Sequence, residues 1–434
     1  MVQRLDSTAQ DFDARFDALV ADRREPAVDV DDAVATIIAT VRARGDDALF
    51  ELTAKYDRFD LSHETLRVGD AEIAAARHNC DDKVVKALEL AHERILSHHR
   101  RQRPDDQRYT DPQGVTLGHR WTAVGSAGLY VPGGTASYPS SVLMNAVPAK
   151  VAGVARLVMV VPCPGGTLNP LVLAAAEIAG IDEIYRIGGA QAIAALAWGT
   201  QTIAPVDKIV GPGNAYVAAA KRQVFGTVGI DMVAGPSEVL IVADGDNEPD
   251  WVAADLLAQA EHDSAAQSIL ITDDRTFADR VADAVVHALE RLGRRDIAQA
   301  SWQRHGAIIT LDRLSDAVRL IDRIAPEHLE LQCASAEELC MAVRNAGAIF
   351  IGRYTPEAIG DYVGGSNHVL PTARSARFSS GLSVLDFMKR TTILECSEAS
   401  LAEIGPAAIT LGEAEGLDAH ARSVAIRLNR RRGR

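Results

Sequence analysis

Between Gly128 and Phe225 the chain repeats one pattern, in which a short apolar run meets a glycine-containing turn and a helix-length segment follows. The apolar runs are Leu129–Val131, Leu157–Val161, Glu183–Ile187 and Lys208–Val210. Strands that alternate with helices of this length are typical of parallel βαβ units. The glycine turns should then lie at the carboxyl ends of the strands, where open α/β sheets bind ligands.

A second series of apolar runs follows, again separated by helical stretches: Val239–Val242, Ile269–Ile271, Ala307–Thr310, Leu329–Gln332 and Ala348–Ile351. The expected fold class is therefore α/β, with two domains of similar style and parallel-rich sheets. We assign residues 129–236 to an inserted domain, and residues 26–128 with 237–381 to a discontinuous domain around it. A helical N-terminal arm (1–25) and a small helical C-terminal domain (382–434) complete the organisation.

Composition excludes several classes of protein. The net charge of −14 argues against nucleic acid as the main partner, because phosphate binding needs a positive surface. We find no apolar run of 18 residues and no signal peptide, so we expect no membrane span. The five cysteines form no CxxC pair, which favours reduced thiols and a cytoplasmic location. The arginine-rich tail, 421–434, is either a solvated terminus or a contact to an acidic partner subunit.

Metal-capable side chains gather after the apolar run Val239–Val242. Gln259 and His262 stand three residues apart, so a helix would put them on one face. Asp361 and His420 are further candidates from separate segments. Two imidazoles, one carboxylate and one amide oxygen suit zinc, with manganese or cobalt as alternatives. Taken singly, each of these residues is also consistent with an ordinary surface or core position.

Two further segments carry possible chemistry. Glu327 and His328, in the sequence APEHLE, pair a carboxylate with a group that titrates near neutral pH; a surface turn would read the same way. The turn 211–216, GPGNAY, follows a strand and opens a helix but lacks the last glycine of the GxGxxG dinucleotide fingerprint. Asp231 follows the turn at about the sequence separation expected of a ribose-binding acid, but no clear strand precedes it. The glycine turns are therefore consistent both with nucleotide binding and with a purely structural role.

Several segments closely resemble the histidinol dehydrogenases, zinc enzymes that use NAD for the last two oxidations of histidine biosynthesis. They are AGPSEVL, QAEHD, IAPEHLE, GDYVGGSNHVLP and EGLDAH. The resemblance implies two incomplete Rossmann-like domains, of which the inserted one binds NAD. It also implies a homodimer with active sites shared between subunits, so that His420 would bind the neighbour's zinc.

The resemblance assigns residues to each role. It implies that Glu327 and His328 handle protons, and that the NAD contacts are Tyr130, Gln191 and Asn214. The implied zinc ligands are Gln259, His262, Asp361 and His420. The implied substrate contacts are the same four residues with His328, Ser237, His368 and Glu415.

We therefore expect an L-histidinol dehydrogenase that oxidises its substrate through L-histidinaldehyde to L-histidine with two NAD. Two alternatives use the same residues differently. A zinc-dependent hydrolase would use Glu327 to activate water, with purely structural glycine turns. A non-catalytic nucleotide-binding or assembly protein would catalyse no reaction.

Overall fold

The computed structural model describes residues 2–22, 30–133, 138–181, 183–233 and 235–428. The chain divides into two compact units, the first made of residues 1–102 and 125–387, the second of 103–124 and 388–434. The end of the expected N-terminal arm (23–25) and the end of the arginine-rich tail (429–434) lie outside the described residues. No helix in the described part of the chain has the length and apolar character needed to cross a membrane.

The first unit contains a six-stranded sheet whose strands are all parallel. Its order is β1 (Gln3–Asp6), β11 (Ala307–Thr310), β10 (Gln267–Thr272), β9 (Glu238–Ala243), β12 (His328–Gln332) and β13 (Ala348–Ile351). The expected apolar runs coincide with five of these strands. The sixth, β1, was missed: the sequence predicted a helical arm, whereas β1 pairs with β11, and α1 (Phe12–Ala21) is the helical part of the described arm.

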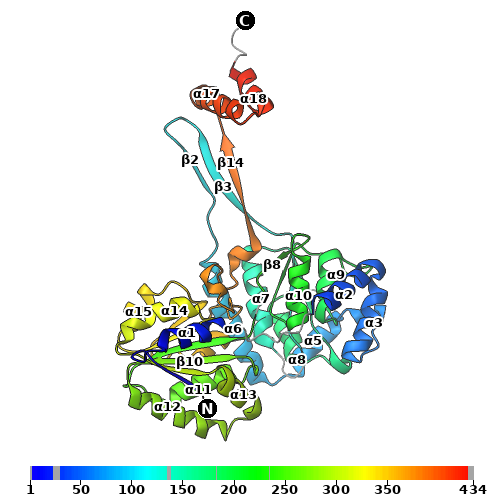
Figure 1. The fold of residues 1–434 in the computed structure, drawn as a ribbon. Helices are drawn as coiled ribbons and strands as arrows, with labels where there is room; N and C mark the ends of the chain where they lie inside the picture. Colours follow the sequence, from blue (N-terminus) through cyan, green and yellow to red (C-terminus); the bar gives the residue numbers. More distant parts are fainter. Residues whose placement is uncertain (1, 23–29, 134–137, 182, 234, 429–434) are drawn as a thin grey trace. The chain divides into compact units, whose positions relative to one another are not determined.

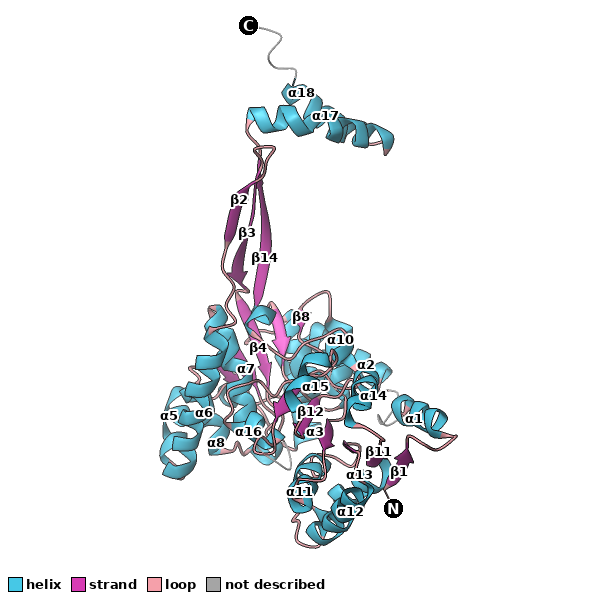
Figure 2. Cartoon of the chain, turned by 90° about the vertical axis from the view of Figure 1, so that its left-hand side faces the viewer, coloured by secondary structure: helices cyan, strands magenta, loops and turns pink. Residues whose placement is uncertain are grey.

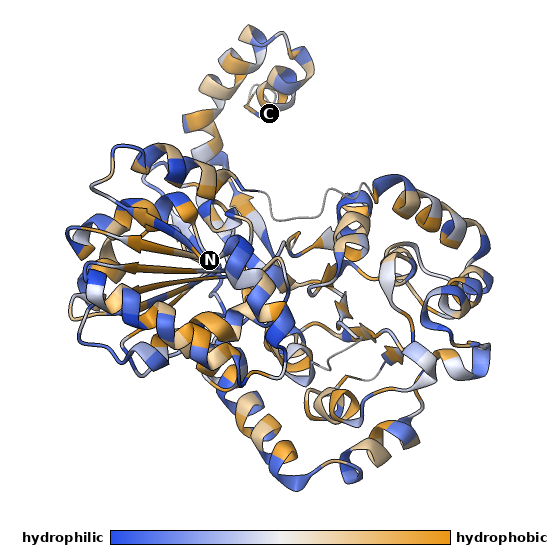
Figure 3. Ribbon diagram, turned by 60° about the horizontal axis from the view of Figure 1, so that its bottom comes forward, coloured by the Kyte–Doolittle hydropathy of each residue, from blue (hydrophilic) through white to orange (hydrophobic). Residues whose placement is uncertain are grey.

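Both faces of this sheet are buried, as the continuous apolar strands require. Leu240 and Val242 face a core that includes α1, α14 (Ala317–Ile324) and α15 (Ala336–Ala342). The intervening residues of β9 face a second core, built from α11 (Pro249–Ala260), α12 (Arg275–Leu289) and α13 (Arg295–His305). Figure 3 shows these hydrophobic strands, beside the N-terminus, between helices with hydrophilic outer surfaces.

A second parallel sheet in the same unit has five strands: β6 (Glu183–Tyr185), β5 (Arg156–Val160), β4 (Ser126–Tyr130), β7 (Lys208–Val210) and β8 (Gly229–Ile230). The connecting helices are α7 (Pro139–Ala152), α8 (Pro170–Ile178), α9 (Gly189–Trp198) and α10 (Ala215–Val224). The repeated strand–turn–helix pattern is thus confirmed, and its turns lie at the carboxyl ends of the strands. Figure 1 labels the four helices α7, α8, α9 and α10 and the edge strand β8.

The early helices pack differently from the expected grouping. They are α2 (Asp31–Arg44), α3 (Asp46–Asp57), α4 (His63–Leu66), α5 (Asp70–His78) and α6 (Asp82–Arg100). We grouped them with the later strands, but α2 packs against α9 and α10, α5 against α8, and α6 against α7. They therefore cover the helices of the five-stranded sheet. The exact domain bounds stay a prediction.

The second unit joins two distant segments of the chain. Strands β2 (Gln107–Thr110), β3 (Thr116–Ala123) and β14 (Met388–Glu395) form an antiparallel sheet in the order β14-β3-β2, and Figure 2 shows them side by side. Helices α17 (Glu398–Ala414) and α18 (Asp418–Leu428) pack against each other. The helices that the sequence predicted from residue 398 onward are present in the described chain, whereas strand β14, which precedes them, was not predicted.

Candidate active site

Glu327 and His328, the predicted proton-handling pair, lie at the amino-terminal edge of the six-stranded sheet. Glu327 precedes β12 and His328 opens it, while Glu238 opens the neighbouring strand β9. His328 lies opposite Val239 in the parallel register. The usual ligand-binding edge of an open α/β sheet is the carboxyl end of its strands, so this site departs from that rule. Short segments before β9 and β12 build it.

The backbone of Glu238 anchors both side chains. Its N–H donates to Glu327 Oε2 at 2.9 Å, and its carbonyl oxygen accepts from His328 Nδ1 at 3.0 Å. A carbonyl oxygen can only accept, so Nδ1 carries a proton and Nε2 is left as the basic nitrogen. Nε2 is buried without a hydrogen-bond partner among the described residues. The ring is thus oriented with its basic atom free to take a proton.

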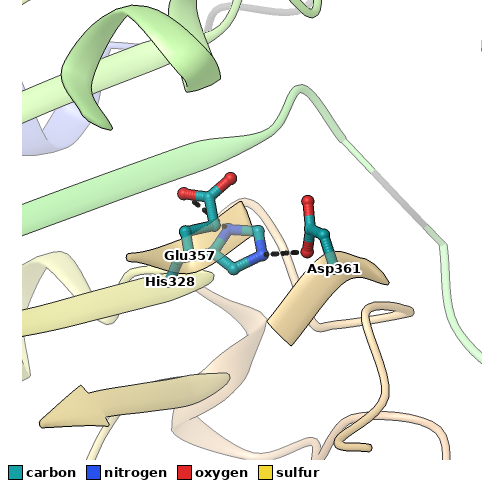
Figure 4. Close-up of side chains that lie close together, drawn as sticks. All are labelled: His328, Glu357 and Asp361. Carbon is teal, nitrogen blue, oxygen red and sulfur yellow. Dashed lines mark ion pairs between the residues drawn. The ribbon is translucent and has the colours of Figure 1, made fainter. Parts of the chain in front are cut away.

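Three carboxylates surround the His328 ring. Nδ1 lies 3.7 Å from Glu327 Oε2. Figure 4 shows the other two contacts, in which Nδ1 lies 3.8 Å from Glu357 Oε2 and Nε2 lies 3.7 Å from Asp361 Oδ1. Burial alone would lower the pKa of the ring. The carboxylates outweigh burial, Glu357 most strongly, and raise the pKa of His328 well above its ordinary value. The ring is therefore a stronger base than a free histidine.

The pKa of Glu327 is shifted by a different cause. Its side chain is almost fully buried, and desolvation of the carboxylate raises its pKa to about 7, although the nearby His328 acts in the opposite direction. A carboxyl group with a pKa in this range can both take and release a proton near neutral pH. The site therefore holds two side chains suited to proton transfer.

Helix α16 (Glu357–Tyr362) supplies two of the three carboxylates, four residues apart on one face. Glu357, Asp361 and His328 each offer a ligand atom, and these atoms lie within 4.8 Å of one another. Asp361 was a predicted metal ligand, whereas Glu357 was missed. The signal that could have found Glu357 is its spacing of four from Asp361.

The other predicted metal ligands lie in two places. Gln259, fully buried in the last turn of α11, faces Glu357. His262 follows α11 and is exposed; partial desolvation nevertheless lowers its pKa, and the charge of Asp361 opposes that shift. His420 belongs to α18 of the second unit and is exposed. The structure thus gathers part of the predicted set around β12 and α16.

The predicted substrate contacts also divide. His368 uses both ring nitrogens: Nδ1 lies 3.0 Å from the Asp361 carbonyl oxygen and Nε2 lies 3.2 Å from Ser141 Oγ on α7. It therefore braces α16 against the five-stranded sheet's first helix. Ser237 is half-buried just before β9. Glu415, like His420, is exposed in the second unit.

The predicted NAD contacts lie along the carboxyl edge of the five-stranded sheet. Tyr130 ends β4, and its hydroxyl accepts a hydrogen bond from Gly189 N at 3.1 Å. Burial raises the pKa of this hydroxyl to about 12. Gln191 is buried in the first turn of α9. Asn214 caps α10 by accepting from Tyr216 N and Val217 N at 3.1 and 3.2 Å.

Asp231, which the sequence offered as a ribose-binding acid, is engaged by groups of the protein itself. It forms a buried ion pair with Lys221, and its Oδ2 accepts from Gly211 N at 2.8 Å. Lys221 in turn donates to the Gly211 carbonyl oxygen at 3.0 Å. Both charges therefore hold the GPG turn in place, with Gly211 at a φ of 112° beside the Tyr130 backbone.

Comparison with known proteins gives the family. The model of the histidinol dehydrogenase family matches residues 21–428. A histidinol dehydrogenase of Rhodospirillum rubrum is 65% identical over 431 residues, which cover 99% of both chains. The chain belongs to the histidinol dehydrogenase family. A relative from Rhodopseudomonas palustris is also 65% identical, over 99% of this chain and 100% of its own.

The fold agrees with this membership. A crystal structure of histidinol dehydrogenase from Elizabethkingia anophelis superposes with a TM-score of 0.94 at 35% identity, and the match covers 98% of each chain. The expected α/β fold class and family are thus confirmed. The chain is an oxidoreductase of histidine biosynthesis, and neither the hydrolase nor the non-catalytic alternative is favoured.

Proposed function

We propose that this chain oxidises L-histidinol through L-histidinaldehyde to L-histidine, using two NAD and a bound zinc ion, in the cytoplasm. The observation that carries the proposal is the oriented pair Glu327 and His328, set beside metal-capable side chains in a member of this family. Formation of NADH by the purified protein, given L-histidinol and NAD, tests it. A rate no higher than that without L-histidinol would contradict it.

The residues fit the two bound groups. Gln259, His262 and Asp361, with His420, offer oxygen and imidazole donors without thiolates, a set that suits zinc. At the other site, helices α9 and α10 begin at the carboxyl edge of the five-stranded sheet, so the positive ends of their dipoles would favour the phosphates of a dinucleotide there. Zinc would supply a Lewis acid that holds the substrate, and NAD would supply the oxidant.

The protein's own groups would move the protons. His328 Nε2 would accept the hydroxyl proton of L-histidinol in the first oxidation and serve again in the second. Glu327 would take a proton from the water that adds to the aldehyde carbon. Ser237, His368 and Glu415 would contribute to substrate binding. A divalent cation at Asp361 would partly offset the carboxylate charges that raise the pKa of His328.

Glu327→Gln should separate the two oxidations. Water must be activated only for the aldehyde, so we expect the variant to lose roughly 10²- to 10⁴-fold in histidinaldehyde oxidation and much less in histidinol oxidation. The glutamine keeps an oxygen that can accept from Glu238 N, which preserves the local anchor. Each half-reaction is measured with its own substrate. Equal losses in both would contradict the assigned roles.

The second unit leaves an apolar surface for a partner. Its helices α17 and α18 bury few residues, all of them small: Ser400, Gly405, Gly412 and Ala421. The larger apolar residues of the unit are exposed, among them Leu394, Ile404, Leu411, Leu417 and Ile426. So small a core does not stabilise a helix pair alone. We infer that it packs on a second copy of the chain, where His420 and Glu415 would complete the neighbour's site.

Subunit mixing tests this sharing. His420→Asn and His262→Asn proteins, each expected to be inactive, are unfolded together and refolded. If sites are shared, half of the dimers are hybrids with one intact site, and up to roughly a quarter of wild-type activity returns. Each variant refolded alone is the control. Activity near zero in the mixture would show that each chain supplies its whole site.

A further inference from the structure

Glu357 makes contacts that the proposed roles leave unexplained. Its side chain is 3% exposed, at the start of α16. The Gln259 amide nitrogen donates to Glu357 Oε1 at 2.7 Å and lies 3.3 Å from Oε2, when the amide is oriented to satisfy its neighbours. In that orientation the Gln259 oxygen lies 3.1 Å from Glu238 N, whose N–H it shares with Glu327 Oε2, and it keeps a second lone pair for a metal. Glu357 thus accepts a hydrogen bond from Gln259, a proposed zinc ligand.

The chemistry of the two groups decides how Gln259 points. A carboxylate can only accept hydrogen bonds, whereas an amide has a donor nitrogen and an acceptor oxygen. Glu357 therefore selects the nitrogen and turns the oxygen of Gln259 away from itself. Only the oxygen can bind a cation. An unrestrained amide would offer either atom, because its two orientations have nearly the same shape.

Glu357 is itself held firmly. Its backbone N–H donates to Glu330 Oε1 at 2.7 Å, and Gln332 Nε2 donates to the other oxygen of Glu330 at 2.6 Å. Gln332 also donates to Asp255 Oδ2, at 2.7 Å, on α11, the helix that carries Gln259. These bonds fix the start of α16 against α11 and β12. The fold, and not a bound metal ion, therefore fixes the backbone that carries the Glu357 carboxylate.

We propose that Glu357 is a positioning residue that fixes the amide of Gln259 with its oxygen available to the metal. This inference rests on the proposed function, since it needs Gln259 to be a ligand. It differs from a direct role for Glu357 as a metal ligand, which its closeness to Asp361 and His328 would also allow. Outer-shell partners of this kind typically change metal affinity by roughly 10- to 100-fold.

A double-mutant cycle separates these roles. The affinity of the metal-free, full-length protein for cobalt(II) is measured from cobalt absorption for the wild type, Glu357→Met, Gln259→Met and the double variant. We expect Glu357→Met to weaken binding roughly 10- to 100-fold. We expect the double variant to bind no more weakly than Gln259→Met, because Glu357 acts only through that side chain.

Glu357→Gln is the matched control, because its carbonyl oxygen can still accept from Gln259. We expect about a twofold loss, the cost of letting two amide pairings coexist. Equal losses in Glu357→Gln and Glu357→Met would overturn the proposal in favour of a charge or ligand role. Multiplying losses in the double variant, or wild-type affinity in a folded Glu357→Met protein, would overturn it too. A wild-type protein that binds no divalent metal would contradict the zinc proposal itself, and this inference with it.

Discussion

Replacement of His328 by asparagine is expected to lower kcat for L-histidinol by roughly 10²- to 10⁴-fold. The asparagine amide nitrogen can still donate to the Glu238 carbonyl oxygen, so the strand edge keeps its anchor. It has no basic atom to replace Nε2, which takes the proton in our account. Steady-state kinetics with L-histidinol and NAD measure the effect.

The same variant should keep its metal, because His328 is not among the proposed zinc ligands. Zinc analysis of the purified protein is therefore the control. A loss of activity below tenfold, with the metal retained, would remove His328 from the proton-transfer role. A loss of activity that merely follows a loss of metal would instead point to the cluster of His328, Glu357 and Asp361 as the binding site.

Asp361→Ala is expected to lose nearly all bound zinc and nearly all activity. Asp361 is half-buried in α16 and keeps a pKa below its ordinary value despite burial, because His328 stabilises its charged form. An ionised carboxylate at this position is a good ligand for a divalent ion. Elemental analysis after gel filtration measures the metal. We expect His262→Ala to behave in the same way.

Asp263→Ala is the matched control for this prediction. Asp263 is an exposed carboxylate beside His262, and its Oδ1 accepts from Ala265 N within its own turn. Its removal should leave zinc content and activity near those of the wild type. If Asp361→Ala retains one zinc per chain, Asp361 is not a ligand, and the proposed set must be revised.

The sequence predicted most of the fold because its strands are buried on both faces. Val239–Val242 and Ile269–Ile271 are continuous apolar runs, which is the pattern of parallel strands covered by helices. Strands β1 and β14 lack that pattern, since QRLD and MKRTTILE carry charges and are partly exposed. Their pairing depends on distant segments, β11 and β3, that no local signal identifies.

The candidate site was predictable where the chemistry is local. Glu327 and His328 are adjacent in sequence, and the backbone of one residue, Glu238, orients both. Glu357 was missed because its proposed role depends on Gln259, almost a hundred residues earlier, which only the fold brings beside it. Asp231 was considered as a ribose-binding acid for a similar reason, since its ion pair with Lys221 becomes visible only in the structure.

The most direct test of the account is the stoichiometry of a complete reaction. A limiting, known amount of L-histidinol is converted with excess NAD, and NADH and L-histidine are both quantified, with and without a zinc chelator. The account predicts two NADH and one L-histidine per L-histidinol, no reaction after chelation, and recovery when zinc is restored. One NADH per L-histidinol with aldehyde as the end product, or full turnover by the metal-free protein, would contradict it.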